Sequence, residues 1–77
     1  MIKVYSTPTC PYCVTLKEWL KEKNIEFEDV DVAADERARD EMIQKSGQMG
    51  VPVIDVNGQI VVGFDKEKLC KILKLED

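Results

Sequence analysis

The sequence STPTCPYCVTLKEWL, from Ser6 to Leu20, carries the clearest structural signal in the chain. Two cysteines, Cys10 and Cys13, lie three positions apart between a short apolar run and a segment with apolar residues at helical spacing. Pro11 suits the first turn of a helix, where its missing N–H needs no partner. The pattern therefore predicts a strand, a tight turn and a helix that begins at the cysteine pair.

The rest of the chain also divides into short elements. In chain order, the expected elements are a strand at 1–6, a helix from 11 to about 24, a strand at 25–32 with a bulge or an end near Asp29, a helix at about 35–46, strands at 53–56 and 60–62, and a helix at 65–75. Asn57-Gly58 is the favoured two-residue turn of a hairpin, and Gly47 is suited to close the second helix.

The element order β-α-β-α-β-β-α limits the possible folds. A strand–helix–strand unit of this length pairs its two strands in parallel, and the hairpin adds an antiparallel pair. We therefore expect an α/β fold with a four-stranded mixed sheet and three helices on its faces. A chain of 77 residues is expected to form one domain, 1–77.

Composition argues against several classes of partner. The chain has 15 acidic and 11 basic residues, and this net charge of -4 argues against nucleic acid as a partner. No run approaches the roughly 20 apolar residues of a membrane span, and the first residues lack the apolar stretch of a signal peptide. We expect a monomer that works in the cytoplasm without a membrane partner.

The cysteine pair has three possible roles. A structural disulfide between Cys10 and Cys13 would close only a tiny loop and would add little stability. A zinc site needs four ligands, so Cys70 would have to join, together with a carboxylate or water, because the chain has no histidine. Exchange of a disulfide needs only the pair itself, and we predict no metal. On its own, Cys70 is expected to be a half-buried hydrophobic residue rather than a regulatory thiol.

The two cysteines are expected to differ chemically. Cys10 stands where the helix begins, and free backbone N–H groups and the helix dipole stabilise a thiolate there. Cys13 lies one turn further, on the inward face. We predict that Cys10 attacks a substrate disulfide and that Cys13 attacks the resulting mixed disulfide.

The motif CPYC at the start of the first helix resembles the glutaredoxins, and KSGQMGVPVIDVNG at residues 45–58 is similar to their segment leading into the hairpin. The resemblance covers essentially the whole chain and implies the minimal thioredoxin fold and dithiol–disulfide oxidoreductase activity. It also implies that Pro52 is cis beside the cysteines and that the Val51 backbone pairs with the bound thiol substrate. Pro11 and Tyr12 would contact that substrate.

The same resemblance bears on the electron donor. Family members that use glutathione usually carry a lysine before the first cysteine, where this chain has Ser6-Thr7-Pro8. After the hairpin, Gly63, Phe64, Asp65 and Lys66 stand where those members have two glycines and an acidic pair, and could bind a carboxylate and an ammonium. Phe64 also resembles redoxins that are reduced by thioredoxin reductase, some of which supply ribonucleotide reductase.

The resemblance thus implies disulfide-containing protein substrates and a donor that is either glutathione or a flavoenzyme of the thioredoxin-reductase type. It implies no tightly bound cofactor. A non-enzymatic alternative is a module that senses redox state or bridges an iron–sulfur cluster between two chains. The aromatic residues Tyr12 and Phe64 are expected near the cysteines, and Trp19 is expected in the core.

Overall fold

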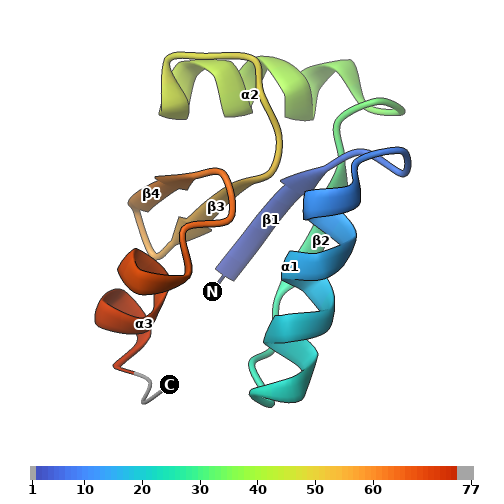
Figure 1. The fold of residues 1–77 in the computed structure, drawn as a ribbon. Helices are drawn as coiled ribbons and strands as arrows, with labels where there is room; N and C mark the ends of the chain where they lie inside the picture. The colour runs from blue at the N-terminus through green and yellow to red at the C-terminus, as the bar shows by residue number, and fades with distance from the viewer. Residues whose placement is uncertain (1, 75–77) are drawn as a thin grey trace.

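The computed structural model describes residues 2–74 and contains the seven elements in the predicted order (Figure 1). They are β1 (Ile2–Ser6), α1 (Pro11–Glu22), β2 (Glu28–Asp31), α2 (Glu36–Ser46), β3 (Val53–Val56), β4 (Gln59–Val62) and α3 (Lys66–Leu73). None of the helices in this described part is long and apolar enough to cross a bilayer.

The four strands form one mixed sheet in the order β2-β1-β3-β4. β1 pairs with β2 in parallel and with β3 in antiparallel, and β3 pairs with β4 through the hairpin. The predicted α/β fold with a four-stranded mixed sheet is therefore confirmed. β2 forms one edge of the sheet, and its Glu28, Asp29 and Asp31 are exposed.

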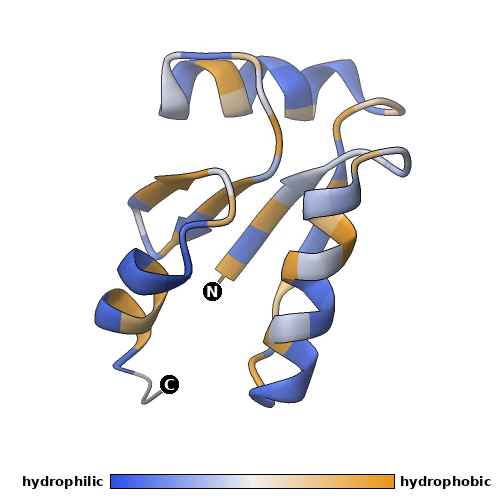
Figure 2. Ribbon diagram, viewed as in Figure 1, coloured by the Kyte–Doolittle hydropathy of each residue, from blue (hydrophilic) through white to orange (hydrophobic). Residues whose placement is uncertain are grey.

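Helices cover both faces of the sheet, α1 and α3 on one side and α2 on the other (Figure 1). Successive side chains of β1 point to opposite faces of the sheet and so enter two hydrophobic cores. Val4 packs with α1 and α3 on one face, and Tyr5 packs with Met42 of α2 on the other. Figure 2 shows this alternation as hydrophobic and hydrophilic bands along β1. Trp19 is buried in the α1 core, as predicted.

β2 begins later than predicted. The expected strand at 25–32 with a bulge or an end near Asp29 is wrong, because the strand starts at Glu28 and continues through Asp29 to Asp31. The Ile25 N–H donates to the Leu20 carbonyl at 2.9 Å, so Ile25 still belongs to the turn that ends α1. Ile25 and Phe27 pack against the core from this connection rather than from a strand.

Local signals set the remaining boundaries. Asp35 caps α2 by accepting hydrogen bonds from two backbone N–H groups of its first turn, and Gly47 ends that helix at a φ of 72°. Asn57 and Gly58 have φ values of 51° and 98°, as a hairpin turn of type I′ requires. The predicted helix near 35–46 and the predicted hairpin turn are both confirmed.

A polar network joins α2 to the sheet. Lys45 Nζ lies 2.7 Å from Asp55 Oδ2 and 2.9 Å from the Tyr5 hydroxyl, which donates to Glu41 at 2.8 Å. Asp55 is 9% exposed, and its other oxygen accepts the Gly58 N–H of the hairpin turn at 2.7 Å. The hydrogen bond from Lys45 holds the pKa of Asp55 below its ordinary value. This network fixes the end of α2 from which the next loop departs.

Candidate active site

Cys10 occupies the N-cap of α1, as the sequence predicts. Its backbone is extended, with φ −93° and ψ 112°, and Pro11 is the first residue of the helix. The Cys10 Sγ accepts the backbone N–H of Cys13 at 3.3 Å, so the sulfur stands in for the oxygen of an ordinary capping side chain. Cys10 is half-buried.

Cys13 lies one turn further along α1 in a different environment. Its side chain is fully buried. Burial, together with the hydrogen bond to Cys10, raises the pKa of the Cys13 thiol to about 11. A thiol with this pKa is protonated at neutral pH and becomes a nucleophile only when a base removes its proton. The predicted difference in burial is confirmed, because Cys13 is fully buried and Cys10 is only half-buried.

The loop between α2 and β3 brings a second segment to Cys10. The Val51-Pro52 peptide bond is cis, and the Cys10 thiol donates to the Val51 carbonyl at 3.9 Å. Within residues 2–74, no protein group accepts the Val51 N–H, which leaves it available to an extended partner. Residues 41 positions apart in sequence therefore share one site.

The end of β4 adds a third segment. The Gly63 N–H donates to the Pro52 carbonyl at 2.8 Å, and Gly63 adopts a φ of 79° that favours glycine. This hydrogen bond ties the loop after the hairpin to the cis proline beside Cys10. The contacts thus bring Gly63 to the candidate site through Pro52.

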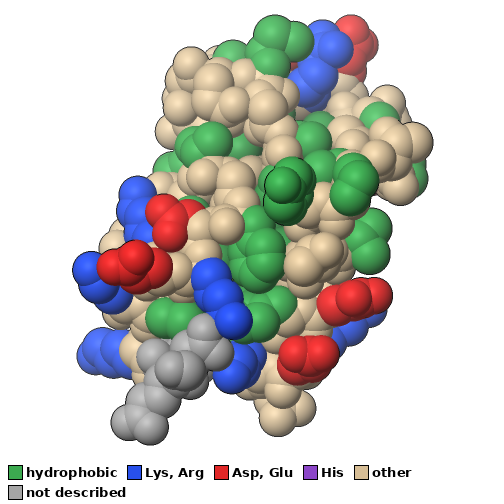
Figure 3. Space-filling view, in the orientation of Figure 1, with side chains coloured by type: hydrophobic (Ala, Val, Ile, Leu, Met, Phe, Trp, Pro, Cys, Tyr) green, Lys and Arg blue, Asp and Glu red, His purple; other side chains and the backbone are tan. Residues whose placement is uncertain are grey.

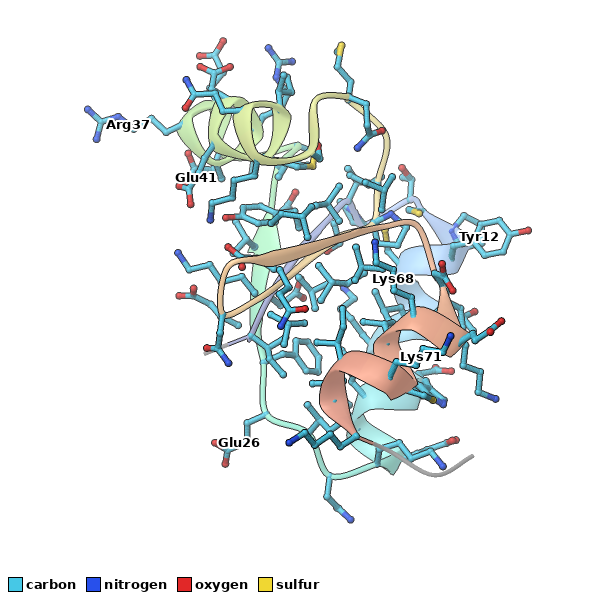
Figure 4. All side chains as sticks on the ribbon, turned by 90° about the vertical axis from the view of Figure 1, so that its left-hand side faces the viewer. Tyr12, Glu26, Arg37, Glu41, Lys68 and Lys71 are labelled. Atoms are coloured by element: carbon cyan, nitrogen blue, oxygen red, sulfur yellow. The ribbon has the colours of Figure 1, made fainter. Side chains whose placement is uncertain are left out.

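The remaining predicted site residues lie on α1, in the turn after β4 and at the start of α3. Tyr12 is 69% exposed and projects away from the body of the molecule (Figure 4). The Phe64 ring packs against Trp19, with ring centroids 5.8 Å apart. Asp65 caps α3 by accepting the Lys68 N–H at 3.1 Å, and Lys66 is the first residue of that helix.

One polar contact near α1 was not anticipated from the sequence. Lys17 Nζ lies 3.0 Å from Asp29 Oδ2, and the buried Ser6 hydroxyl donates to Asp29 Oδ1 at 2.8 Å. Lys17 lies one helical turn after Cys13, and its charge partly offsets the rise in the pKa of that thiol. The i,i+4 spacing from Cys13 was the available signal in the sequence.

The structure also describes the surroundings of Cys70 and of potential metal ligands. Cys70 of α3 is half-buried and packs against the core that α1 and α3 share with the sheet, as predicted for a small hydrophobic residue. Among residues 2–74, no three Cys, Asp or Glu side chains gather closely enough to hold a metal ion.

Comparison with known proteins identifies relatives of the chain. The model of the glutaredoxin family matches residues 2–61. The chain is 55% identical over 74 residues to a glutaredoxin-like 8.6 kDa protein in the rubredoxin operon of Clostridium pasteurianum, covering 96% of this chain and 99% of that protein. It is 34% identical over 64 residues to glutaredoxin 3 of Escherichia coli (strain K12), covering 83% and 77% respectively.

A solved structure of a related protein has the same fold. The crystal structure of the thioredoxin-like protein BC3987 superposes with a TM-score of 0.87 at 38% identity, covering 94% of this chain and 99% of that one. The family model spans both cysteines, the cis proline and the hairpin as far as Val61. The chain therefore belongs to the glutaredoxin family of thiol redox proteins.

Proposed function

We propose that the protein is a dithiol–disulfide oxidoreductase in which Cys10 attacks and Cys13 resolves. The Cys10 thiolate attacks one sulfur of a substrate disulfide, which forms a mixed disulfide and releases the other substrate sulfur as a thiolate. The observation that carries this assignment is the unequal burial of the pair. Cys10 is accessible at the helix start, whereas Cys13 is fully buried.

In the second step, Cys13 loses its proton and its thiolate attacks the Cys10 sulfur. This forms the Cys10–Cys13 disulfide and releases the second substrate thiolate, so the substrate gains the two electrons that the protein loses. The free Val51 N–H and the neighbouring carbonyl would hold the substrate backbone beside the reacting sulfurs. A reductant then returns the pair to the dithiol form.

We infer that this reductant is a flavoenzyme of the thioredoxin-reductase type, with glutathione as the alternative. The inference rests on the stretch Ser6-Thr7-Pro8 shortly before the first cysteine, which contains no lysine. The acceptors would be disulfides in proteins or small molecules, in a reducing compartment such as the cytoplasm.

Two coupled assays test the activity and the donor. One contains NADPH, glutathione reductase and glutathione, and the other contains NADPH and thioredoxin reductase, each with the protein and an insulin disulfide substrate. We expect turnover with thioredoxin reductase.

Cys10→Ser should abolish turnover, and Cys13→Ser should accumulate mixed disulfides, whereas Cys70→Ser serves as the control. Full turnover by Cys10→Ser would refute the mechanism. Purified protein that is brown and dimeric would instead favour the alternative in which two chains bridge an iron–sulfur cluster.

A further inference from the structure

The segment that carries the cis proline, residues 46–54, has very few polar side chains. The chain as a whole is 34% charged, yet this segment includes no Asp, Glu, Lys or Arg. Figure 3 shows charged side chains mostly in the lower part of the molecular surface and at its upper edge. Side-chain nitrogen and oxygen atoms in residues 46–54 belong only to Ser46 and Gln48. Any hydrogen bond from a side chain of this segment to its own backbone therefore comes from these two residues.

Gln48 uses its amide to hold the backbone of Gly50 at both polar groups. Its Oε1 accepts the Gly50 N–H at 2.5 Å, and its Nε2 donates to the Gly50 carbonyl at 3.1 Å. Nε2 also donates to the Ser46 hydroxyl oxygen at 3.1 Å, and that oxygen lies 2.7 Å from the Met42 carbonyl oxygen. The half-buried Gln48 amide thus links the last turn of α2 to the peptide units before the cis proline.

The identity of Gly50 fits this contact. Gly50 lacks the positive φ of Gly47 and Gly63, so its backbone conformation does not require glycine. A Cβ on Gly50 would instead lie 2.7 Å from Oε1 of Gln48, closer than these two atoms can approach without displacement. The missing side chain at position 50 therefore leaves the space that the Gln48 amide occupies.

The hydrogen bond to the Gly50 carbonyl also sets the direction of the Val51 N–H. This carbonyl and this N–H belong to one peptide unit, which is trans, because Val51-Pro52 is the only cis bond within residues 2–74. In a planar trans unit the two groups point in opposite directions. The Val51 N–H therefore points away from Gln48. A hydrogen bond accepted at the carbonyl also polarises the unit and makes its N–H a stronger donor.

We propose that Gln48 is a positioning residue whose amide orients the Val51 N–H toward the backbone of a peptide disulfide. This inference rests on the proposed oxidoreductase function and deepens it, because it ties the recognition of peptide substrates to one side chain outside the cysteine pair. The Val51 N–H would donate to a substrate carbonyl while Cys10 attacks the neighbouring disulfide. A disulfide without peptide groups would gain nothing from Gln48.

Single-turnover kinetics test the role of Gln48 without any upstream donor. Protein reduced with dithiothreitol and then desalted is mixed with insulin or with hydroxyethyl disulfide, which has no peptide group. Acid quenching, alkylation of the remaining thiols and mass spectrometry give the rate constant for oxidation of the cysteine pair. We expect Gln48→Ala to slow the reaction with insulin about three- to tenfold, the effect of one weakened hydrogen bond. It should slow the reaction with hydroxyethyl disulfide by less than about twofold.

Gly50→Ala tests the same contact from its other side. Its Cβ displaces the Gln48 amide, so this variant should also slow the reaction with insulin about three- to tenfold. Adding Gly50→Ala to Gln48→Ala should cause less than about a twofold further change, because the amide that the Cβ would displace is already gone. Fully additive effects would show that the two residues act separately and would overturn the proposal.

Gln44→Ala, at an exposed position of α2, is the matched control and should keep both rates. By NMR, the Gly50 N–H should exchange with water faster in Gln48→Ala than in the wild type, because it loses its acceptor. A wild-type rate of Gln48→Ala with insulin would overturn the proposal, as would equal slowing with both disulfides, which indicates a general loss of structure. Neither result would affect the proposed function, which fails only if Cys10→Ser still reduces hydroxyethyl disulfide.

Discussion

The backbone N–H of Cys13 donates to the Cys10 Sγ at 3.3 Å, while the Cys13 side chain is itself fully buried. One residue therefore stabilises the sulfur of its neighbour and keeps its own sulfur away from solvent. This relationship separates the two chemical steps, because an external disulfide can reach only the first sulfur. The sulfur of Cys13 can react only with the mixed disulfide that forms on Cys10.

Alkylation should distinguish the two cysteines. At pH 7 only about one Cys13 in ten thousand is a thiolate if its pKa is about 11. We expect iodoacetamide to label Cys10 of the reduced protein at least about tenfold faster than Cys13. Mass spectrometry of timed digests measures both rates. Equal labelling of the two residues would contradict the buried position of Cys13.

Resolution of the mixed disulfide should accelerate with pH. Burial, the largest cause of the raised pKa of Cys13, persists in the mixed disulfide, so its thiolate fraction should grow as the pH rises above neutral. We expect the collapse of a mixed disulfide between Cys10 and a chromogenic thiol to follow this increase, as measured by stopped-flow absorbance. The mixed disulfide of Cys13→Ser should persist at every pH. A rate independent of pH would show that proton removal from Cys13 does not limit this step.

Alkaline conditions should also weaken the fold. The pKa of Cys13 is higher in the folded protein than in the unfolded chain, so its contribution to stability is complete below an ordinary thiol pKa of about 9 and is lost as the pH approaches 11. We expect the free energy of unfolding in urea to fall across this window. Cys13→Ala should make the decrease of the unfolding free energy with rising pH smaller. Tyr5→Phe is the control for Tyr5, whose pKa is also raised by burial.

Asp55 should matter for stability through two separable contacts. Asp55→Asn removes the charge paired with Lys45 but keeps an oxygen for the Gly58 N–H, and we expect a loss of about 1–3 kcal/mol. Asp55→Ala should cost about 1 kcal/mol more, because it also removes the acceptor in the turn. Urea unfolding followed by the fluorescence of Trp19 measures both. Glu28→Gln, at a more exposed ion pair of 4.0 Å, should change stability by less than about 0.5 kcal/mol.

The same carboxylate should make the protein sensitive to acid. Lys45 lowers the pKa of Asp55 in the folded state, so this contribution is present above the ordinary value of 3.8 and is lost as the pH falls below it. We expect the difference in unfolding free energy between the wild type and Asp55→Asn to shrink between pH 5 and about pH 3. A constant difference would mean that the Lys45 pairing does not stabilise the fold.

The hairpin turn should depend on the backbone of Gly58. Its φ of 98° disfavours residues with a side chain, although a Cβ there would meet nothing within 4 Å. Gly58→Ala should therefore destabilise the protein by about 1 kcal/mol through backbone conformation alone. Asn57→Gly should be tolerated within about 0.5 kcal/mol. Thermal unfolding of the two variants tests this, and an unaffected Gly58→Ala would argue against a type I′ turn.

Local patterns in the sequence were enough for most of the fold and for the positions of the two cysteines. The position of Cys10 at a helix start and the Asn57-Gly58 turn depend on neighbouring residues alone. The approach of Val51 to Cys10 depends on tertiary packing, so only the resemblance to a family predicted it. Lys17 and Lys45 look like any solvated lysine in the sequence, and their partners on β2 and β3 become evident only once the sheet is assembled.

The acidic edge strand β2 has a consequence for behaviour at high concentration. An unpaired strand edge is a template on which a second copy can add its own strand. Two β2 strands brought together would set Glu28, Asp29 and Asp31 of one molecule against those of the other, without a compensating positive charge in either strand. We expect repulsion between these carboxylates to disfavour the addition of a second strand along this edge.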